Sequence, residues 1–215
     1  GLAPYFREFL RLYMTANKPV KNSAAYTWNK SQYKVDSTAW ENDPLYGWCK
    51  KNSKVDGSSY DLYADGLKIY TTLDSRMQKY AEQAVVEHLS QEIQPEFDAE
   101  KVHKANSPFS NDMTKDKIER ALDRSVRQSE RYRILNKEGM NYEDIRKNFD
   151  VPVEMQIFTW KGIRDTTMTP LDSIKHYKSF FRAGFMVMDP KTGYIKAYVG
   201  GPNFSYFMYD MVSVG

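Results

Sequence analysis

Ser31 and Lys34 have the spacing of a serine nucleophile and its base. A lysine one helical turn after a serine can take the hydroxyl proton, so that the serine oxygen can attack a carbonyl carbon. Such chemistry needs a rigid element to hold the pair, whereas the residues around it are polar and show no helical apolar face. We therefore interpret Ser31 as a linker residue and not as a nucleophile.

Glu143 and Asp144 are the only adjacent Glu-Asp pair, and paired carboxylates can serve general acid or base catalysis. Surface carboxylates are mostly solvated, so the polar face of a short helix is the simpler interpretation.

A stripe of arginines has intervals of four, three and four, which places its members on one side of a helix. The stripe consists of Arg120, Arg124, Arg127 and Arg131. It could bind an anionic polymer, lipid head groups or a regulatory protein. Because Glu119, Asp123 and Glu130 are interleaved with it, a solvated mixed-charge face is the favoured interpretation.

Metal and disulfide chemistry lack the residues they need. Cys49 is the single cysteine, and the histidines are scattered at His88, His103 and His176. Cys49 has no nearby base and is interpreted as a packed or idle thiol. The sequence thus predicts no catalytic, cofactor-binding or metal-binding residue in this chain.

Composition bounds the class of protein. The 215 residues are 41% hydrophobic and 14% aromatic, which is enough for a core. With 31 basic and 28 acidic residues the net charge is +3, so we expect no nucleic-acid partner. No apolar run reaches the ~20 residues of a membrane span, and no signal segment opens the chain. Both ends look cut, so we expect a fragment of a longer protein whose membrane anchor lies elsewhere.

The first third contains one expected helix and a long polar stretch. Pro4–Met14 shows helical spacing with Pro near the start. Residues 18–65 are polar and contain Trp28, Trp40 and Trp48, which indicates a linker with one short helix at about 40–51.

Gly66 opens a new pattern. Leu67–Thr72 is rich in β-forming residues, and Asp74 is placed to cap the helix that follows. That helix shows an apolar face at intervals of three and four. The face consists of Met77, Tyr80, Ala81, Ala84, Val85, His88 and Leu89.

The middle of the chain is charged and mostly helical. We expect irregular structure over 91–111, then one long helix over 115–136. Its thin apolar stripe consists of Ile118, Leu122, Val126 and Tyr132. A short helix over 142–148 and a strand over 151–160 follow, the strand with Val153, Met155, Ile157 and Thr159 on one side. Thr169 and Pro170 then begin a helix that runs to about Phe181.

The clearest element is a hairpin over 184–201. Phe185–Met188 is continuously apolar, as in a strand covered on both faces. Asp189–Gly193 has the residues of a tight turn. The return strand alternates, with Ile195, Ala197 and Val199 on one face and Tyr194, Lys196 and Tyr198 on the other. The whole pattern predicts an α+β fold in which helices pack on a small antiparallel sheet.

Three segments resemble class A penicillin-binding proteins in sequence and in order. They are Ala3–Arg11, Gly66–Asp74 and Gly184–Gly201, and the charged middle does not align by eye. These proteins are bifunctional peptidoglycan synthases with an N-terminal glycosyltransferase and a C-terminal transpeptidase domain. The resemblance implies that 1–17 ends the glycosyltransferase domain and that 18–65 is the interdomain linker. It implies that 66–215 begins an incomplete transpeptidase fold, with a helical insertion at about 95–150.

The resemblance also implies that the catalytic serine is missing. In the family a Ser-x-x-Lys motif follows shortly after the glycine pair that matches Gly200-Gly201, and this chain stops at Gly215. Lys191-Thr192-Gly193 spells the third family motif but occupies a turn. The middle motif, Ser-x-Asn, is absent, since Ser110-Asn111-Asp112 has another order. Glu143-Asp144 lacks the aromatic, histidine and glycine that flank the glycosyltransferase pair.

We therefore expect a non-catalytic part of a cell-wall synthase, on the extracytoplasmic face of the bacterial inner membrane. Its partners would be peptidoglycan or its precursors through the parent enzyme, together with accessory cell-wall proteins. The alternative is a stand-alone extracytoplasmic module that binds a glycan or a protein through the Trp-rich linker and the Arg stripe.

Overall fold

The computed structural model describes residues 1–27, 29–102 and 104–213, so the predictions that involve Trp28 and His103 lie outside the described residues. The regular elements of the described residues are helices and two antiparallel hairpins, which confirms the α+β class. The chain divides into two compact units. The first unit contains Gly1–Glu82 and Gly184–Gly215, and the second contains Gln83–Ala183. Each unit holds one two-stranded sheet, where the sequence had predicted a single sheet.

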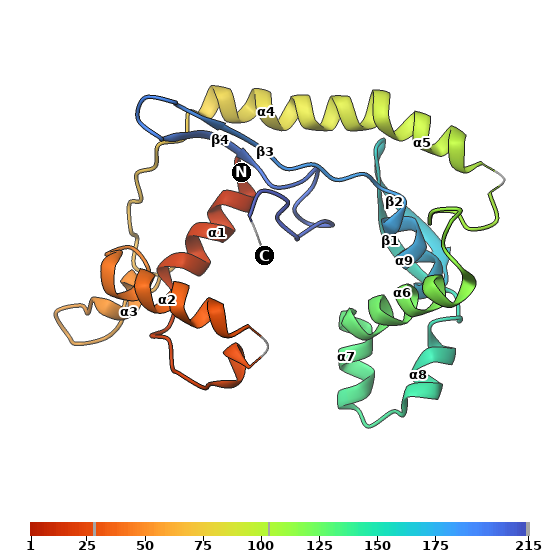
Figure 1. The fold of residues 1–215 in the computed structure, drawn as a ribbon, viewed down its shortest axis with the longest axis horizontal. Helices are drawn as coiled ribbons and strands as arrows, with labels where there is room; N and C mark the ends of the chain where they lie inside the picture. The colour runs from red at the N-terminus through yellow and green to blue at the C-terminus, as the bar shows by residue number, and fades with distance from the viewer. Residues whose placement is uncertain (28, 103, 214–215) are drawn as a thin grey trace. The chain divides into compact units, whose positions relative to one another are not determined.

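Helix α1 (Pro4–Met14) opens the first unit as predicted, with Pro4 in its first turn. It packs beside strand β4 (Ile195–Val199), as Figure 1 shows. The Phe6 ring meets the ring of Tyr198 at 5.8 Å between centroids, and the Phe9 ring stacks on it at 6.5 Å. The aromatic face of α1 therefore covers one side of β4.

The polar stretch over 18–65 is more helical than predicted. It contains a 3₁₀ turn at Ala24–Tyr26 (η1), helix α2 (Lys30–Asn42) and helix α3 (Trp48–Lys51). The single helix predicted at about 40–51 is wrong, because α2 ends at Asn42, where Asp43 is extended before Pro44. Gly47 then precedes α3 in a left-handed conformation (φ 71°). A Cβ on Gly47 would lie 2.3 Å from the Trp40 ring, so this close approach requires glycine.

The prediction of a strand at Leu67–Thr72 is wrong. This segment forms no ladder with β4, and the segment and Asp74 make one isolated bond each to that strand. The Thr72 hydroxyl donates to the Ile195 carbonyl at 2.7 Å, and the Asp74 amide donates to the Lys196 carbonyl at 2.9 Å. Asp74 does cap helix α4 (Ser75–His88), since its Oδ1 accepts from the Arg76 amide at 2.9 Å.

The buried face of α4 is rotated about the helix axis relative to the predicted apolar face. Its buried positions are Gln78, Ala81 and Val85, followed by Leu89 just beyond the helix. Met77 and Tyr80 are exposed, and the His88 side chain, predicted on that face, is 58% exposed. The reason is Gln78, whose amide bonds to β4 and turns that side of the helix inward.

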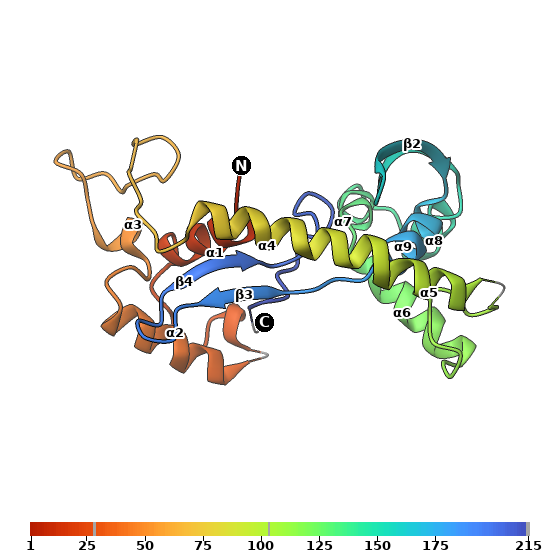
Figure 2. The ribbon, with the colours of Figure 1, turned by 90° about the horizontal axis from the view of Figure 1, so that it is seen from above.

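Strand β3 (Phe185–Met188) pairs antiparallel with β4, with Phe185 opposite Val199. Figure 2 shows the beginning of α4 lying along this hairpin. Two predictions fail here. Phe185, Met186 and Met188 are exposed, so β3 is not covered on both faces. Tyr198, predicted to face outward, is 5% exposed because α1 packs over it.

In the second unit α4 does not stop before an irregular region, as predicted for 91–111. It continues through one π-helical turn, Leu89–Ile93 (η2), into helix α5 (Gln94–Lys101). Residues 104–114 form turns and irregular structure. Pro95 is the second residue after the π-helical turn, and it cannot donate a backbone hydrogen bond to the preceding helical turn.

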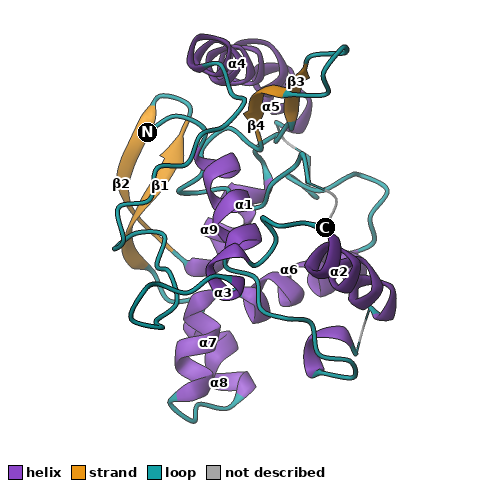
Figure 3. Cartoon of the chain, turned by 90° about the vertical axis from the view of Figure 1, so that its left-hand side faces the viewer, coloured by secondary structure: helices purple, strands orange, loops and turns teal. Residues whose placement is uncertain are grey.

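The long helix predicted over 115–136 is two helices, α6 (Lys115–Gln128) and α7 (Glu130–Lys137). Ser129 is extended between them, and its hydroxyl caps α7 by accepting from the Tyr132 amide at 3.2 Å. Helix α8 (Tyr142–Asn148) has the predicted bounds, and Figure 3 shows it beside α7. The core here consists of Val126, Ile145 and Phe149.

Strand β1 (Val153–Thr159) lies within the predicted strand, and Ile157 is buried on the predicted side. It pairs with an unpredicted strand, β2 (Gly162–Met168). Helix α9 (Pro170–Lys178) begins as predicted, with the Thr169 hydroxyl accepting from the Asp172 amide at 3.0 Å, but it ends before Phe181. Among the described helices none is long and apolar enough to cross a membrane.

Candidate functional site

The structure places Ser31 and Lys34 in the first turns of α2, so the pair does lie on a helix. Both residues are exposed. The Ser31 hydroxyl donates to Asn29 Oδ1 at 2.7 Å, and Asn29 is the residue that caps the helix. Ser31 thus takes part in a capping arrangement at the start of α2.

The other motif-like triplets lie on turns. In the β3–β4 hairpin the Asp189 carbonyl accepts from the Gly193 amide at 2.8 Å, and Gly193 has φ 72°. Asp189 Oδ1 accepts from the Lys191 amide, and this bond lowers the pKa of the carboxyl. Turn geometry therefore accounts for Lys191-Thr192-Gly193. Ser110-Asn111-Asp112 lies in the turns before α6.

Glu143 and Asp144 are exposed in the first turn of α8, as the solvated interpretation predicts. Asn141 donates to Asp144 at 2.7 Å, and this hydrogen bond lowers the pKa of the carboxyl. The pair is a helix-terminal feature and has no enclosed surroundings.

The arginine stripe is engaged within the second unit. Arg127 donates to Asp123 at 2.9 Å, and its guanidinium lies 3.9 Å above the Tyr142 ring. Arg131 donates to Asn148 at 2.8 Å, and Arg120 to the Asp116 carbonyl at 3.2 Å. Arg124 is exposed and contributes to the lowered pKa of Lys178, which arises first from desolvation and then from Arg182 and Arg124. Most of the stripe therefore stabilises its own helices.

Cys49 is 1% exposed, and burial raises the pKa of its thiol. It is a packed thiol, as expected. Among the described residues no group of three or more His, Cys, Asp and Glu side chains could hold a metal ion.

The best-organised polar site of the first unit joins α1 to the hairpin, and we call it the α1 joint. Tyr5 is 3% exposed, and its hydroxyl donates to the Phe207 carbonyl at 2.5 Å. Its ring packs on the backbone of Gly200 and Gly201. A Cβ on Gly200 would lie 2.6 Å from the Tyr5 ring, and one on Gly201 would lie 2.4 Å from the Tyr5 hydroxyl. The glycine pair is therefore required by the close approach of α1.

Gln78 forms the second part of the α1 joint. Its Oε1 accepts from the Tyr198 amide at 2.7 Å, and its Nε2 donates to the Tyr198 carbonyl at 2.9 Å. The side chain thus bonds to β4 as a neighbouring strand would. Nε2 also donates to Glu82 Oε1 at 2.8 Å, and the same oxygen accepts from the Ala3 amide at 2.7 Å. One continuous network therefore ties the start of α1 to α4 and β4.

Tyr198 forms the third part of the α1 joint. Its hydroxyl donates to Asp210 Oδ2 at 2.6 Å. Desolvation by burial, followed by the Asp210 carboxylate, raises the pKa of Tyr198 well above its usual range. The phenol stays protonated and bonded at ordinary pH, so it holds the segment after the glycine pair against the hairpin.

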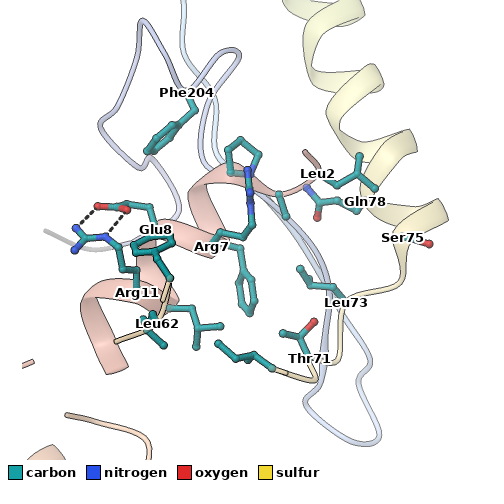
Figure 4. Close-up of a pocket in the computed structure, with 16 residues that line it drawn as sticks. Leu2, Arg7, Glu8, Arg11, Leu62, Thr71, Leu73, Ser75, Gln78 and Phe204 are labelled. Atoms are coloured by element: carbon teal, nitrogen blue, oxygen red, sulfur yellow. Dashed lines mark hydrogen bonds and ion pairs between the residues drawn. The ribbon is translucent and has the colours of Figure 1, made fainter. Parts of the chain in front are cut away.

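A pocket of about 600 Å³ lies beside the joint (Figure 4). Phe6, Leu10 and Arg7 of α1 line one wall, and Ile69, Thr71 and Leu73 line another. Figure 4 shows Arg11 paired with Glu8, and this pair has a nitrogen to oxygen distance of 2.6 Å. The lining of this pocket is mainly apolar.

Sequence reasoning missed the joint residues Tyr5, Gln78 and Glu82. Their partners lie 79 to 202 residues away in sequence, so no local pattern reports the pairing. One signal was present, since Gln78 is the polar residue in the series 78, 81, 85 and 89. A glutamine within an apolar stripe indicates a buried hydrogen-bond partner.

One comparison with known proteins gives a match, and it falls on the charged middle of the chain. Residues 104–181 match the family described as penicillin-binding protein middle domain. The matched segment contains α6 to α9 and the β1–β2 hairpin. The searches of curated proteins and of solved structures returned no significant match. The family match supports the identification of this chain as part of a penicillin-binding protein.

Proposed function

We propose that the chain is the non-catalytic connecting part of a peptidoglycan synthase that resembles class A penicillin-binding proteins. In this proposal α1 is the exit from a glycosyltransferase domain, residues 18–65 connect the domains, and residues from Gly66 onward begin the transpeptidase domain. The parent enzyme would be anchored in the membrane and act on its extracytoplasmic face, with peptidoglycan and accessory cell-wall proteins as partners.

The observation that carries the proposal is the α1 joint. Tyr5 of α1 bonds to Phe207, 202 residues further along, and packs on Gly200-Gly201. A flexible linker would leave the two catalytic domains free to reorient, whereas a buried joint fixes the direction in which α1 leaves the hairpin. The proposed task of the joint is to keep the growing glycan and the cross-linking site in a constant position relative to each other.

The test uses the full-length parent enzyme with Tyr5→Ala, and Tyr70→Ala as the matched control, since Tyr70 is 89% exposed. Glycan polymerisation and cross-linking are measured separately on a lipid-linked precursor. We expect polymerisation to persist while the cross-linked fraction falls several-fold in Tyr5→Ala only. Equal cross-linking in both variants would contradict the proposal. Tyr5→Phe, which keeps the ring, should give an intermediate value.

A second test addresses the absence of catalysis. The 215-residue chain is incubated with a fluorescent penicillin, and covalent labelling is followed on a denaturing gel. We expect no labelling, because Ser31 donates to Asn29 and lies exposed. Labelling that disappears in Ser31→Ala would overturn the assignment.

The alternative of a stand-alone binding module makes a different prediction about the parent gene. The proposed synthase needs a glycosyltransferase sequence before this chain and a Ser-x-x-Lys motif after it. A gene that lacks both would favour the binding module.

A further inference from the structure

Strand β2 (Gly162–Met168) has an outer edge that the proposed connecting role does not use. It belongs to a two-stranded sheet, so β2 has a neighbouring strand on one side only. The pairing with β1 runs from Val153 opposite Met168 to Thr159 opposite Gly162 without a bulge. A regular, unpaired strand edge presents a row of N–H and C=O groups to which another extended segment can bond.

The outer edge of β1 is covered at Phe158 by helix α9. The Phe158 amide donates to the Tyr177 hydroxyl at 3.1 Å, and the Phe158 carbonyl lies 2.8 Å from His176 Nε2. Both side chains come from α9, and Figure 3 shows β2 on the side of the hairpin away from this helix. A partner strand therefore cannot bond along the whole of β1, which favours β2 as the edge for such a strand.

The same contacts show which backbone groups of β2 face outward. Phe158 stands opposite Ile163, and its N–H and C=O bond to α9, so these two residues form a pair without ladder hydrogen bonds. The N–H and C=O of Ile163 therefore point away from β1. Because the ladder alternates, those of Asp165 and Thr167 do the same. None of these outward groups has a hydrogen-bond partner among the described residues.

Charge is divided between the two faces of the hairpin. Arg164 lies on one face and is the single charged residue of β1 and β2 there, whereas Asp165 and Glu154 lie on the other. Arg164 and Asp165 are exposed and point to opposite faces, so they cannot pair with each other. Asp165 accepts from the Gln156 side chain at 2.9 Å. Neither Arg164 nor Asp165 makes an ion pair in the part of the chain that the structure describes.

These charges select the strand that can add to β2. An acidic side chain opposite Arg164 and a basic one opposite Asp165 would give each an ion-pair partner on the face to which it already points. Ile163, which is 50% exposed, adds an apolar position. A second copy of β2 fits less well. Full antiparallel overlap of two β2 strands places Asp165 opposite its own copy, and like charges directly opposite each other destabilise pairing.

We propose that β2 binds an extended segment of a partner protein as a third, antiparallel strand, with an acidic side chain opposite Arg164 and a basic one opposite Asp165. Backbone bonds to Ile163, Asp165 and Thr167 attach the segment, and the two charge pairs select its sequence. Along the partner chain the order is basic, acidic, apolar. The inference goes beyond the connecting role, which involves α1 and the β3–β4 hairpin, and does not depend on it.

Two peptides of the same composition and net charge test the selection. The probe is the acetylated and amidated peptide Val-Thr-Lys-Glu-Val-Thr-Val, and the control peptide exchanges its Lys and Glu. Binding to the 215-residue chain is measured by calorimetry. We expect the probe to bind several-fold more tightly than the control peptide, with a difference that shrinks as salt is added. Equal affinity for both peptides, or no binding of the probe, would overturn the proposal.

Methylation of single amide nitrogens in the probe tests the backbone bonds. In the proposed strand the amide of the valine that follows Glu points toward β2, whereas the amide of Glu points away. We expect a methyl group on that valine nitrogen to abolish binding and one on the Glu nitrogen to leave binding in place. Equal effects of the two methyl groups would mean that side chains alone hold the peptide, and would contradict a third strand.

A charge exchange in the chain locates the site. Arg164→Glu combined with Asp165→Lys exchanges the two charges at exposed positions of β2, and this variant should prefer the control peptide. The matched control combines Lys137→Glu with Glu138→Lys, which exchanges two adjacent, exposed charges at the end of α7, and it should keep the original preference. Circular dichroism checks that both variants are folded. An unchanged preference in the β2 variant would contradict the assignment.

Sedimentation of the unmodified chain tests a second copy as the occupant. We expect no dimer that the β2 charge exchange dissociates. Such a dimer would assign the edge to a second copy and overturn the proposal.

The outcome can be separated from that of the proposed function. Peptide binding is measured on this chain, whereas the connecting role is tested by cross-linking in the parent enzyme. Selective peptide binding together with equal cross-linking in Tyr5→Ala and Tyr70→Ala would leave the strand site standing and remove the connecting role.

Discussion

The two units are stabilised by different kinds of contact. In the first, buried polar groups bond across long stretches of sequence, as Gln78 does with Tyr198, 120 residues away. In the second, short helices are capped by their own neighbours, and a small apolar cluster of Val126, Ile145 and Phe149 holds them together. A network of buried polar bonds fixes the α1 joint, whereas the second unit depends on local caps and apolar burial, with one buried glutamine, Gln94, bonded to Ser179 and Phe181. The predictions below test this contrast.

The largest effect is expected for Phe149→Ala in the second unit. Phe149 is 1% exposed, so its removal leaves a cavity and should cost about 3–5 kcal/mol in the free energy of unfolding. Denaturant unfolding gives the total, and hydrogen exchange should show lost protection in α6 and α8 while β4 stays protected. Ile134→Ala, at a position 46% exposed, is the control. Loss of protection in β4 as well would mean that the two units unfold as one.

Gln78→Leu should destabilise the first unit and leave the second unit unchanged. The Tyr198 amide and carbonyl would be buried without their partner, at about 1–2 kcal/mol each, so we expect a loss of about 2–4 kcal/mol. Exchange should increase at β4 and leave α6 and α8 unchanged. The matched control is Gln83→Leu on the same helix, because Gln83 is exposed and bonds only to Glu87 in the described structure. Similar losses in both variants would contradict the role of the buried amide.

Gly200→Ala tests whether the close approach of the Tyr5 ring requires glycine at this position. The added Cβ would meet Asp210 Oδ1 at 2.4 Å and the Tyr5 ring at 2.6 Å. We expect a cost of about 1–3 kcal/mol, as for other overpacked sites. The cost should be smaller in a Tyr5→Ala background, where the ring is gone. A cost that is the same in both backgrounds would show that Tyr5 does not set the need for glycine.

The smallest effect is a pH dependence of opposite sign in the two units. The pKa of Tyr198 is raised by burial and that of Tyr13 is raised to about 12. Unfolded tyrosine has a pKa of 10.0, so the unfolded chain loses its protons first, and the first unit loses stability above about pH 10.

Lys178 acts in the other direction. Its pKa is lowered from 10.5, so its charge opposes folding at neutral pH and this penalty fades as the pH rises toward 10.5. Unfolding curves of the full chain and of Tyr198→Phe, followed by circular dichroism, check the first part. The variant should lose less stability than the unmodified chain above pH 10, and identical pH dependence would contradict the burial argument.

The sequence predicted those elements whose signals are local. The bounds of α8, the Thr169 cap of α9 and the Asp189–Gly193 turn are confirmed, because each depends on residues within a few positions. The break at Ser129 was missed, since serine is tolerated within helices and only its capping bond reveals the end of α6. The absence of a strand at 67–72 was missed because β-forming residues need a partner strand, which no local pattern reports.

The joint could not be predicted from the sequence for the same reason. Gly200-Gly201 was visible, but its packing partner Tyr5 lies at the other end of the chain. The resemblance at both ends suggested a family without showing a contact. The family match then fell on residues 104–181, the part that had resisted alignment.

Helix α1 is fixed against the β3–β4 hairpin, and a distance measurement tests this directly. Spin labels at Leu12 and Lys191, both exposed, report the separation of α1 and the hairpin turn by pulsed electron resonance, with Cys49 replaced by alanine. We expect one narrow distance distribution in the otherwise unmodified chain, and we expect it to broaden when Gln78→Leu is combined with Tyr5→Ala. A broad distribution in the unmodified joint would contradict it.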